Sequence, residues 1–301
     1  VAPREIRRLQ SMNIIGTGLS GLVGSRVVEI LASKHTFLNL SLETGVDITN
    51  HKMVYEKVAQ SDAPWVLHFA AYTDVQGAEN ERNLKVDSLA WKVNVLATQH
   101  IADVCMTLGK HMMYLDTDYA FAGEKKRYTE EDAPDPKGWY ATTKTEGANA
   151  VGALGDKGLV LRISNPYRAN PVGKKDFVHK MLERLQQNLG IAAPTDQLFV
   201  PTFIDDIANA ISLLLDQSSY GIYHVVGSTS LSPFDAAKTV ARVFDCDQGQ
   251  ITATTFAQYF LGRSPIPQYA ELSNDKIQKL GVVMRSFTEG LAEVKRQEAV
   301  T

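Results

Sequence analysis

The chain has 301 residues, 44% of them hydrophobic, and a formal net charge of −3. This length and composition allow a large core, either in one large domain or in one domain with a smaller lobe. Basic residues are spread along the chain rather than clustered, which speaks against nucleic-acid binding. No apolar run reaches the roughly 18 residues needed to cross a bilayer, so no membrane association is expected.

The two cysteines, Cys105 and Cys246, do not stand at metal-ligand spacing from another Cys or His. We therefore expect no metal site. So few cysteines fit a reducing compartment, and we expect a cytoplasmic protein. The segment Val1 to Ser11 is rich in arginine and lacks the apolar stretch of a signal peptide. We interpret it as a leader or an expression remnant outside the fold.

Short apolar runs alternate with longer helical patterns through the first half of the chain, a pattern typical of a parallel sheet built from strand-helix-strand units. The runs predict strands at 13–16, 37–40, 65–70, 111–116 and 159–164. The segment 78–108 is long enough for one extended helix. Its expected apolar stripe, a packing feature, consists of Val93, Leu96, Ile101, Val104 and Leu108.

A glycine-rich turn follows the first predicted strand. It can be read as GxGxxG from Gly16, Gly18 and Gly21, or as TGxxGxxG from Thr17, Gly18, Gly21 and Gly24. In either frame the glycines let the backbone approach a pyrophosphate at the N-terminus of the next helix. The segment therefore predicts a Rossmann-type, doubly wound parallel α/β sheet that binds a dinucleotide.

The sequence texture changes after residue 164, where Pro and Gly punctuate short helical pieces. We predict a dinucleotide-binding domain at 12–164 and a smaller substrate-binding lobe formed mainly by 165–301. The lobes are expected to interleave, because 198–226 ends in a strand-like run at 220–226 that could return to the main sheet.

Tyr140 and Lys144 are one helical turn apart, so both side chains can share one face of a helix. A neighbouring ammonium stabilises phenolate, which predicts a lowered pKa for Tyr140 and a role as proton donor to a carbonyl. The YxxxK spacing is weak evidence alone, because such pairs are common on solvated helix surfaces.

Together the motifs resemble the extended short-chain dehydrogenase/reductase family, and within it the dTDP-4-dehydrorhamnose reductase (RmlD-like) branch. The matching segments occur in order along the chain: 17–24, 68–75, 93–94, 116–121, 140–144, 161–163, 196–197, 201–202 and 221–224. The resemblance implies an NAD(P)H-dependent reductase of a 4-keto-6-deoxy sugar nucleotide, with dTDP-4-dehydrorhamnose as the first substrate to test. A homodimer is compatible with it.

The resemblance also implies roles for individual residues. Thr117 would hold the substrate oxygen, Tyr140 would donate the proton, and Lys144 would bind the nicotinamide ribose. The cofactor-binding residues that it implies are Gly18, Leu19, Ser20, Gly21, Leu22, Val23, Gly24, Asp47, Ile48, Phe69, Ala70, Ala71, Tyr140 and Lys144. The substrate-binding residues that it implies are Thr117, Asp118, Tyr119, Asn165 and Arg168, with the segments 165–168 and 196–202 as walls.

Some departures from the branch leave questions open. Asp116 stands where the branch usually has Ser, and could bind a cation, alter the local charge or point away. Residues 40–43 offer neither an Asp for NAD nor an Arg for NADP, so the cofactor is NADP or NAD, with a lean to NADP. The dehydratases carry Asp-Glu after the Thr, whereas Tyr119 follows Asp118 here, which disfavours dehydration. An epimerase and a regulatory subunit resembling that of methionine adenosyltransferase remain as alternatives.

Overall fold

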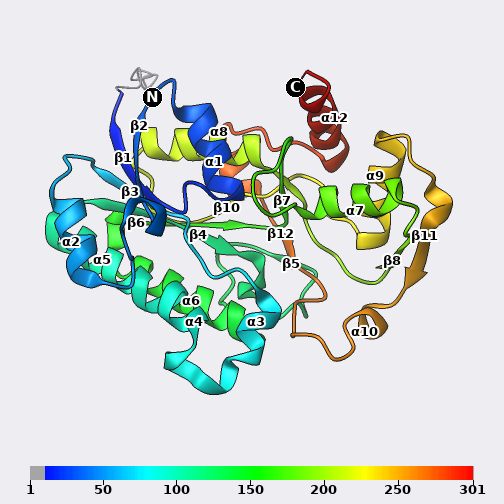
Figure 1. Cartoon of the computed structure of the whole chain (residues 1–301), viewed down its shortest axis with the longest axis horizontal. Helices are drawn as coiled ribbons and strands as arrows, with labels where there is room; N and C mark the ends of the chain where they lie inside the picture. The colour runs from blue at the N-terminus through cyan, green and yellow to red at the C-terminus, as the bar shows by residue number, and fades with distance from the viewer. Residues whose placement is uncertain (1–10, 301) are drawn as a thin grey trace.

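The computed structural model describes residues 11–300, and a six-stranded parallel sheet lies at its centre (Figure 1). The strand order is β10-β6-β4-β3-β1-β2. The expected doubly wound α/β class is confirmed, and the chain changes direction across the sheet between β1 and β3. The strands are β1 Asn13–Thr17, β2 Thr36–Leu40, β3 Trp65–His68, β4 His111–Thr117, β6 Gly158–Ile163 and β10 Gly221–His224.

Helices cover both faces of this sheet, which explains why its strands are near-continuous apolar runs. On one face α1 (Leu22–Leu31) packs against α8 (Ile204–Asp216). On the other face lie α2 (His51–Ala59), α5 (Ala97–Leu108) and α6 (Trp139–Gly152) (Figure 1). Each face has its own buried core, with Val27 and Ile211 in one and Val54 and Ile101 in the other. Both α8 and β10 come from the late part of the chain.

The prediction of one helix over 78–108 is wrong. The chain instead forms α3 (Val75–Asn80), η2 (Arg82–Asp87), α4 (Leu89–Trp91) and the π-helical turn η3 (Lys92–Leu96) before α5. Lys85 has a φ of 48°, which a helix does not allow, and the extended Ser88 caps the next helix by accepting a hydrogen bond from the Trp91 N–H. The wide turn η3 changes the phase of the apolar stripe, so Leu96 is 36% exposed and Val95 is buried in its place.

A second set of elements follows β6 and lies to the right of the sheet in Figure 1. It has a core of its own, built by α7 (Phe177–Gln186), α9 (Pro233–Val243) and α12 (Phe287–Glu298) with the paired strands β8 (Ile191–Pro194) and β11 (Ile251–Thr254). The remaining elements are short: β5 Arg127–Tyr128, β7 Pro166–Tyr167, β9 Thr202–Phe203, β12 Glu271–Leu272, α10 Phe256–Tyr259, α11 Asp275–Gln278, η1 Leu42–Thr44, η4 Asp118–Ala120, η5 Gly155–Lys157 and η6 Gln248–Gln250. Apart from Ser11, the segment expected to be a leader lies outside the described residues.

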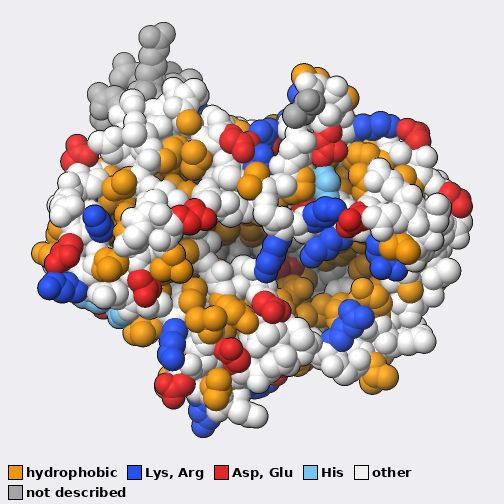
Figure 2. Space-filling view, viewed as in Figure 1, with side chains coloured by type: hydrophobic (Ala, Val, Ile, Leu, Met, Phe, Trp, Pro, Cys, Tyr) orange, Lys and Arg blue, Asp and Glu red, His pale blue; other side chains and the backbone are white. Residues whose placement is uncertain are grey.

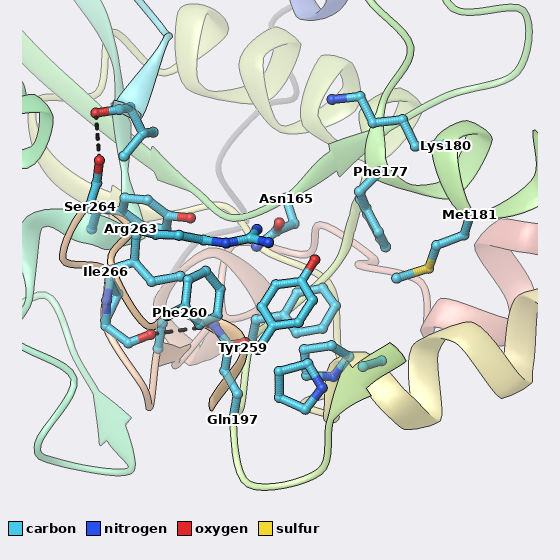
Figure 3. A pocket seen from close by; sticks show the side chains of 18 of the residues that line it. Asn165, Phe177, Lys180, Met181, Gln197, Tyr259, Phe260, Arg263, Ser264 and Ile266 are labelled. Atoms are coloured by element: carbon cyan, nitrogen blue, oxygen red, sulfur yellow. Dashed lines mark hydrogen bonds between the residues drawn. The ribbon is translucent and has the colours of Figure 1, made fainter. Parts of the chain in front are cut away.

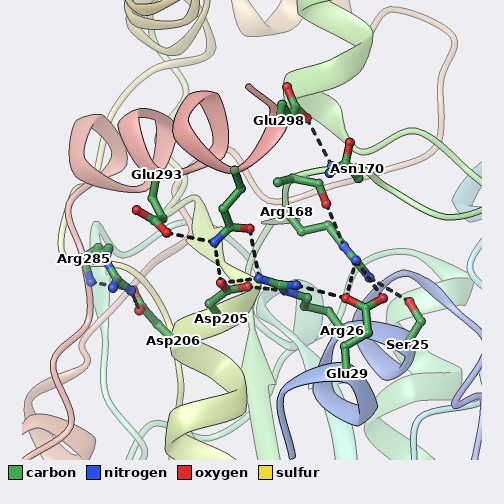
Figure 4. A network of polar contacts seen from close by, with 12 residues as sticks. Ser25, Arg26, Glu29, Arg168, Asn170, Asp205, Asp206, Arg285, Glu293 and Glu298 are labelled. Carbon is green, nitrogen blue, oxygen red and sulfur yellow. Dashed lines mark hydrogen bonds and ion pairs between the residues drawn. The ribbon is translucent and has the colours of Figure 1, made fainter. Parts of the chain in front are cut away.

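A polar network ties α1 to later parts of the chain (Figure 4). Arg26 on α1 donates to Asp205 on α8 at 2.6 Å, and Glu29 on α1 accepts from Arg168 at 2.7 Å. Gln297 on α12 also donates to Asp205, at 2.9 Å. The helix that begins at the glycine-rich turn is therefore held by α8, α12 and the chain after β7.

Candidate active site

Two connected cavities run along the carboxyl edge of the sheet, where a hollow is visible in Figure 2. The larger has a volume of about 1040 Å³ and follows the ends of β1, β2, β3 and β4. The smaller has a volume of about 720 Å³ and lies between the sheet and the second set of elements. Asp118, Asn165 and Lys180 line both cavities. A ligand reaching through this junction would occupy the usual binding position of a doubly wound fold.

The glycine-rich turn forms a cradle at one end of the larger cavity. A Cβ added at Gly18 would lie 2.4 Å from the Ala70 N, and one at Gly24 would lie 2.3 Å from the Gly18 O, so both positions require glycine. Gly21 is the N-cap residue of α1 and has no side chain to cap it, which leaves backbone N–H groups at the helix N-terminus open to a ligand. Close backbone approach and unpaired N–H groups are what a pyrophosphate requires. The residues present therefore fit a dinucleotide.

Most residues expected to bind the cofactor line the larger cavity. They are Gly18, Ser20, Gly21, Leu22, Val23, Gly24, Asp47, Ile48, Phe69, Ala70, Ala71, Tyr140 and Lys144. Leu19 is the exception, because its side chain is only 5% exposed and packs into the core under the turn. Asp47 also accepts hydrogen bonds from Thr49, at 2.7 Å and 2.9 Å, in a local turn.

Thr117, Tyr140 and Lys144 all line the larger cavity. Thr117 ends β4, and the other two lie in the first two turns of α6. The Thr117 hydroxyl donates to the Asp118 carboxylate at 3.1 Å, and the Lys144 ammonium donates to the Leu115 carbonyl at 2.7 Å. Asp118, the residue after Thr117, also lines the smaller cavity, so these three residues lie beside the junction of the two cavities.

The protonation of this set differs from the sequence-based expectation. The pKa of the Tyr140 phenol is raised rather than lowered, because burial dominates and the Asp116, Tyr119 and Asp118 charges add to it, against a hydrogen bond with Thr117. Burial lowers the pKa of the Lys144 ammonium to about 8. Tyr140 therefore keeps its proton at neutral pH.

Asp118 is a second buried acid in the site. Burial raises the pKa of its carboxyl to about 6, against hydrogen bonds from Ser164 and Thr117. The Ser164 hydroxyl donates to Asp118 at 2.7 Å. Because Asp118 lines both cavities, its charge acts on groups in either cavity.

The smaller cavity combines aromatic rings with basic side chains (Figure 3). The Arg263 guanidinium lies 4.5 Å from the centre of the Tyr259 ring. Phe177, Phe260, Lys180 and Arg184 also line the cavity, together with the expected Tyr119 and Asn165. Sequence reasoning missed the α7 residues and the segment 259–267. Their pattern gave no signal, because amphipathic helices and aromatic turns occur in any core.

Arg168 does not line either cavity, so its expected role in substrate binding is not supported. Its buried guanidinium donates to Glu29 at 2.7 Å and to Ser25 at 2.9 Å, and so fastens the chain to α1 (Figure 4). The expected walls are also only partly present. Asn165 and Pro166 contribute from the first, and Gln197 and Phe199 from the second.

Two features are absent from residues 11–300. No group of three or more His, Cys, Asp or Glu side chains in this part of the chain could hold a metal ion. No helix in the same part is long and apolar enough to span a bilayer.

The parallel sheet, the glycine turn after β1 and the Tyr-Lys pair on α6 define a protein of the short-chain dehydrogenase/reductase type. Residues 12–299 match the model of the RmlD substrate binding domain, and the chain belongs to this family.

Named relatives agree along nearly the whole chain. The chain is similar to the dTDP-4-dehydrorhamnose reductase of Aggregatibacter actinomycetemcomitans, with 32% identity over 297 residues that cover 93% of this chain and 97% of that protein. Its identity to the dTDP-4-dehydrorhamnose reductase of Mycobacterium tuberculosis is 28% over 291 residues, which cover 94% and 92% of the two chains. The crystal structure of the Bacillus anthracis dTDP-4-dehydrorhamnose reductase in complex with NADP superposes with a TM-score of 0.86 at 27% identity, covering 96% of this chain and 100% of that chain.

Proposed function

We propose that the chain is an NAD(P)H-dependent reductase of a 4-keto-6-deoxy sugar nucleotide, with dTDP-4-dehydrorhamnose as the first substrate to test. The carrying observation is that Thr117, Tyr140 and Lys144 line one cavity beside its junction with a second. Relatives named dTDP-4-dehydrorhamnose reductase along nearly the whole chain support the same reaction.

The larger cavity would hold the dinucleotide, NADP or NAD, with its pyrophosphate at the turn from Gly18 to Gly24 and its nicotinamide near Tyr140. A bound reduced nicotinamide supplies the hydride. In this arrangement residues 12–164 form the dinucleotide-binding domain, with 198–226 returning to it. Residues 165–301 mainly form the substrate side.

Within the site each residue has a separate task. Lys144 holds the nicotinamide ribose, and its ammonium already has a fixed direction through the Leu115 carbonyl. Thr117 would donate its hydroxyl proton to the substrate oxygen in place of the Asp118 carboxylate, which accepts it in this structure. The raised pKa of Tyr140 keeps its proton in place until the substrate oxygen becomes a strongly basic alkoxide. The Tyr140 phenol then donates that proton.

The smaller cavity suits the nucleotide part of the substrate. A base can stack on aromatic rings such as Tyr259 and Phe260, and a diphosphate carries charge that Arg263, Arg184 and Lys180 can neutralise. The sugar would then lie at the junction beside Asp118 and Asn165. A homodimer is compatible with the proposed reductase, and the mass of the protein in solution tests it.

The decisive experiment measures oxidation of NADH and NADPH by the purified protein across a panel of keto sugar nucleotides. We expect dTDP-4-dehydrorhamnose or a related 4-keto-6-deoxy sugar nucleotide to accelerate oxidation well above background. Change of sugar configuration without net cofactor oxidation would favour the epimerase alternative. No oxidation with any sugar, together with one stoichiometric partner recovered from lysate, would favour the regulatory-subunit alternative over the reductase.

A separate prediction concerns the adenosine end of the larger cavity. Glu43 lines the cavity just after β2, and the segment from Ser41 to Asn50 contains no Lys or Arg. This is the region that reads the ribose 2′ position in doubly wound folds. This segment therefore contains no basic side chain for the 2′-phosphate of NADP, the cofactor favoured by the sequence. We expect Glu43→Lys to shift the ratio of dissociation constants toward NADPH by about tenfold, or about 1.4 kcal/mol, because a carboxylate that repels the 2′-phosphate becomes a cation.

Fluorescence titration with NADH and NADPH measures this ratio directly. The matched control is Glu56→Lys on α2, which makes the same charge change at a side chain that is 56% exposed and is not among the residues that line either cavity. An unchanged ratio in the Glu43 variant, or an equal change in the control, would contradict the prediction.

A further inference from the structure

A buried ion pair lies beside the Tyr140 and Lys144 pair. Asp116 on β4 and Arg162 on β6 are register partners in the sheet, and the Arg162 Nε donates to the Asp116 Oδ2 at 3.0 Å. Their side chains are 0% and 2% exposed. Asp116 also lines the larger cavity. Asp116 therefore does not point to solvent, and among the described residues it belongs to no cluster that could hold a metal ion. Of the three alternatives that the sequence left for Asp116, an effect on the local charge remains.

Stability alone is a poor explanation for this pair. The desolvation cost of two buried charges often exceeds their attraction unless the remaining polar atoms are hydrogen-bonded. Among the described residues, the Asp116 Oδ1 and the Arg162 Nη1 have no hydrogen-bond partner. Two apolar side chains would fill such a place at similar or lower cost. Retaining the carboxylate next to the cavity therefore points to a role in the site.

The carboxylate acts on both residues of the pair on α6. Its charge raises the pKa of Tyr140 and counters the effect of burial on the pKa of Lys144. The Lys144 ammonium reaches β4 next to Asp116, because it donates to the carbonyl of the preceding residue, Leu115, at 2.7 Å. On its other side Arg162 stacks 5.0 Å from the Phe121 ring centre. The titratable and charged groups around Asp116, Tyr140 and Lys144 are His68 from β3, Tyr114 from β4, Asp118 and Tyr119 from η4 and Arg162 from β6.

The other neighbours cannot replace this carboxylate. Burial raises the pKa of Tyr114 and lowers that of His68 to about 3, so both are neutral at neutral pH. Burial raises the pKa of the Asp118 carboxyl to about 6, so it binds a proton more readily than an ordinary aspartate. Asp116 is the carboxylate whose charge raises the pKa of Lys144 against burial.

We propose that Asp116, fixed by Arg162, is a positioning residue that keeps the Lys144 ammonium charged in the buried site beside Tyr140. The proposal rests on the proposed reductase function, in which Lys144 binds the cofactor and Tyr140 donates the proton. It assigns to Asp116 an electrostatic task that acts through Lys144 and requires no contact with the substrate.

The sign of the effect can be worked out from Lys144. Its charge is present below its pKa, which burial lowers to about 8, and is lost as the pH rises through that value. Removing the Asp116 charge lowers this pKa further. In Asp116→Asn we therefore expect the pH at which Lys144 loses its charge to fall by about one unit, a typical effect of one close charge. The alkaline loss of cofactor affinity should move to lower pH with it.

The direct measurement is an NMR titration of the Lys144 side chain, assigned with Lys144→Met, alongside cofactor dissociation constants from pH 6 to 9. Asp116→Asn leaves the buried Arg162 unpaired and could unfold the chain. The double variant Asp116→Asn with Arg162→Gln removes both charges, and Lys144 still loses its carboxylate. We expect the same downward shift in this variant.

The matched control is Asp206→Asn, which removes another buried aspartate paired with an arginine, the partly exposed Arg285, away from both cavities. It should lower stability without moving the Lys144 midpoint. A folded Asp116 variant, single or double, with an unchanged midpoint would overturn the proposal. If the midpoint shifts as expected but no sugar nucleotide is reduced by the unaltered protein, the role of Asp116 stands and the proposed function fails.

Discussion

Tyr140→Phe is expected to lower the turnover of the keto sugar nucleotide by about two to four orders of magnitude, the usual effect of losing a positioned general acid. The variant keeps the ring, which packs against Tyr119 with the ring centres 6.1 Å apart, and loses only the hydroxyl group that carries the proton. Burial and the carboxylates around the phenol keep that proton bound in the parent protein. Cofactor affinity should be nearly unchanged, because Lys144 and the glycine-rich turn are untouched.

Single-turnover kinetics and cofactor titration separate the two quantities. Tyr55→Phe on α2 is the matched control, because it removes the same hydroxyl from a ring that is 40% exposed and lies outside the cavity linings. Its turnover should equal that of the parent. Full turnover in the Tyr140 variant would show that the proton comes from another group, and Asp118 would be the next candidate.

The central sheet could be predicted from the sequence because a parallel strand covered on both faces must be apolar on both faces. Ile14 and Ile15 are neighbours along β1, and both are 0% exposed, in opposite cores. The break inside 78–108 could not be predicted in the same way. Residues 82–87 carry no strong helix breaker, and the interruption depends on contacts such as the 2.7 Å hydrogen bond from the Leu89 N–H to the Glu81 carboxylate.

The candidate site, too, could be predicted from the sequence only in part. The glycine turn and the Tyr140 and Lys144 pair have fixed local spacing, so the sequence places them on one turn and one helix. The wall of the smaller cavity joins α7 with residues 259–267, which are far apart in the chain. Arg168 shows the converse, because only the fold reveals that Glu29 and Ser25 occupy its guanidinium. The raised pKa of Tyr140 could not be predicted either, because it results mainly from burial, and the spacing of two residues in the sequence does not reveal burial.

Gly21→Val is expected to weaken binding of NADH and NADPH by at least about 100-fold, or about 2.7 kcal/mol. Among the glycines of the turn, Gly21 is the one at which a side chain is compatible with folding. Its backbone has a φ of −76° and a ψ of 176°, and an added Cβ would meet only the Gly18 O, at 3.2 Å. The same addition at Gly18 or Gly24 would collide with backbone at 2.4 Å or 2.3 Å and disrupt the turn itself.

The branched side chain in Gly21→Val would instead stand at the N-terminus of α1, where the pyrophosphate needs close access to backbone N–H groups. Cofactor fluorescence measures the loss, and circular dichroism with thermal unfolding shows whether the variant is folded. Gly152→Val is the matched control, because a Cβ there has no neighbour within 4 Å and this residue is not part of either cavity lining. If a folded Gly21 variant binds the cofactor as tightly as Gly152→Val does, the dinucleotide does not lie at this turn, and the assignment of the larger cavity is wrong.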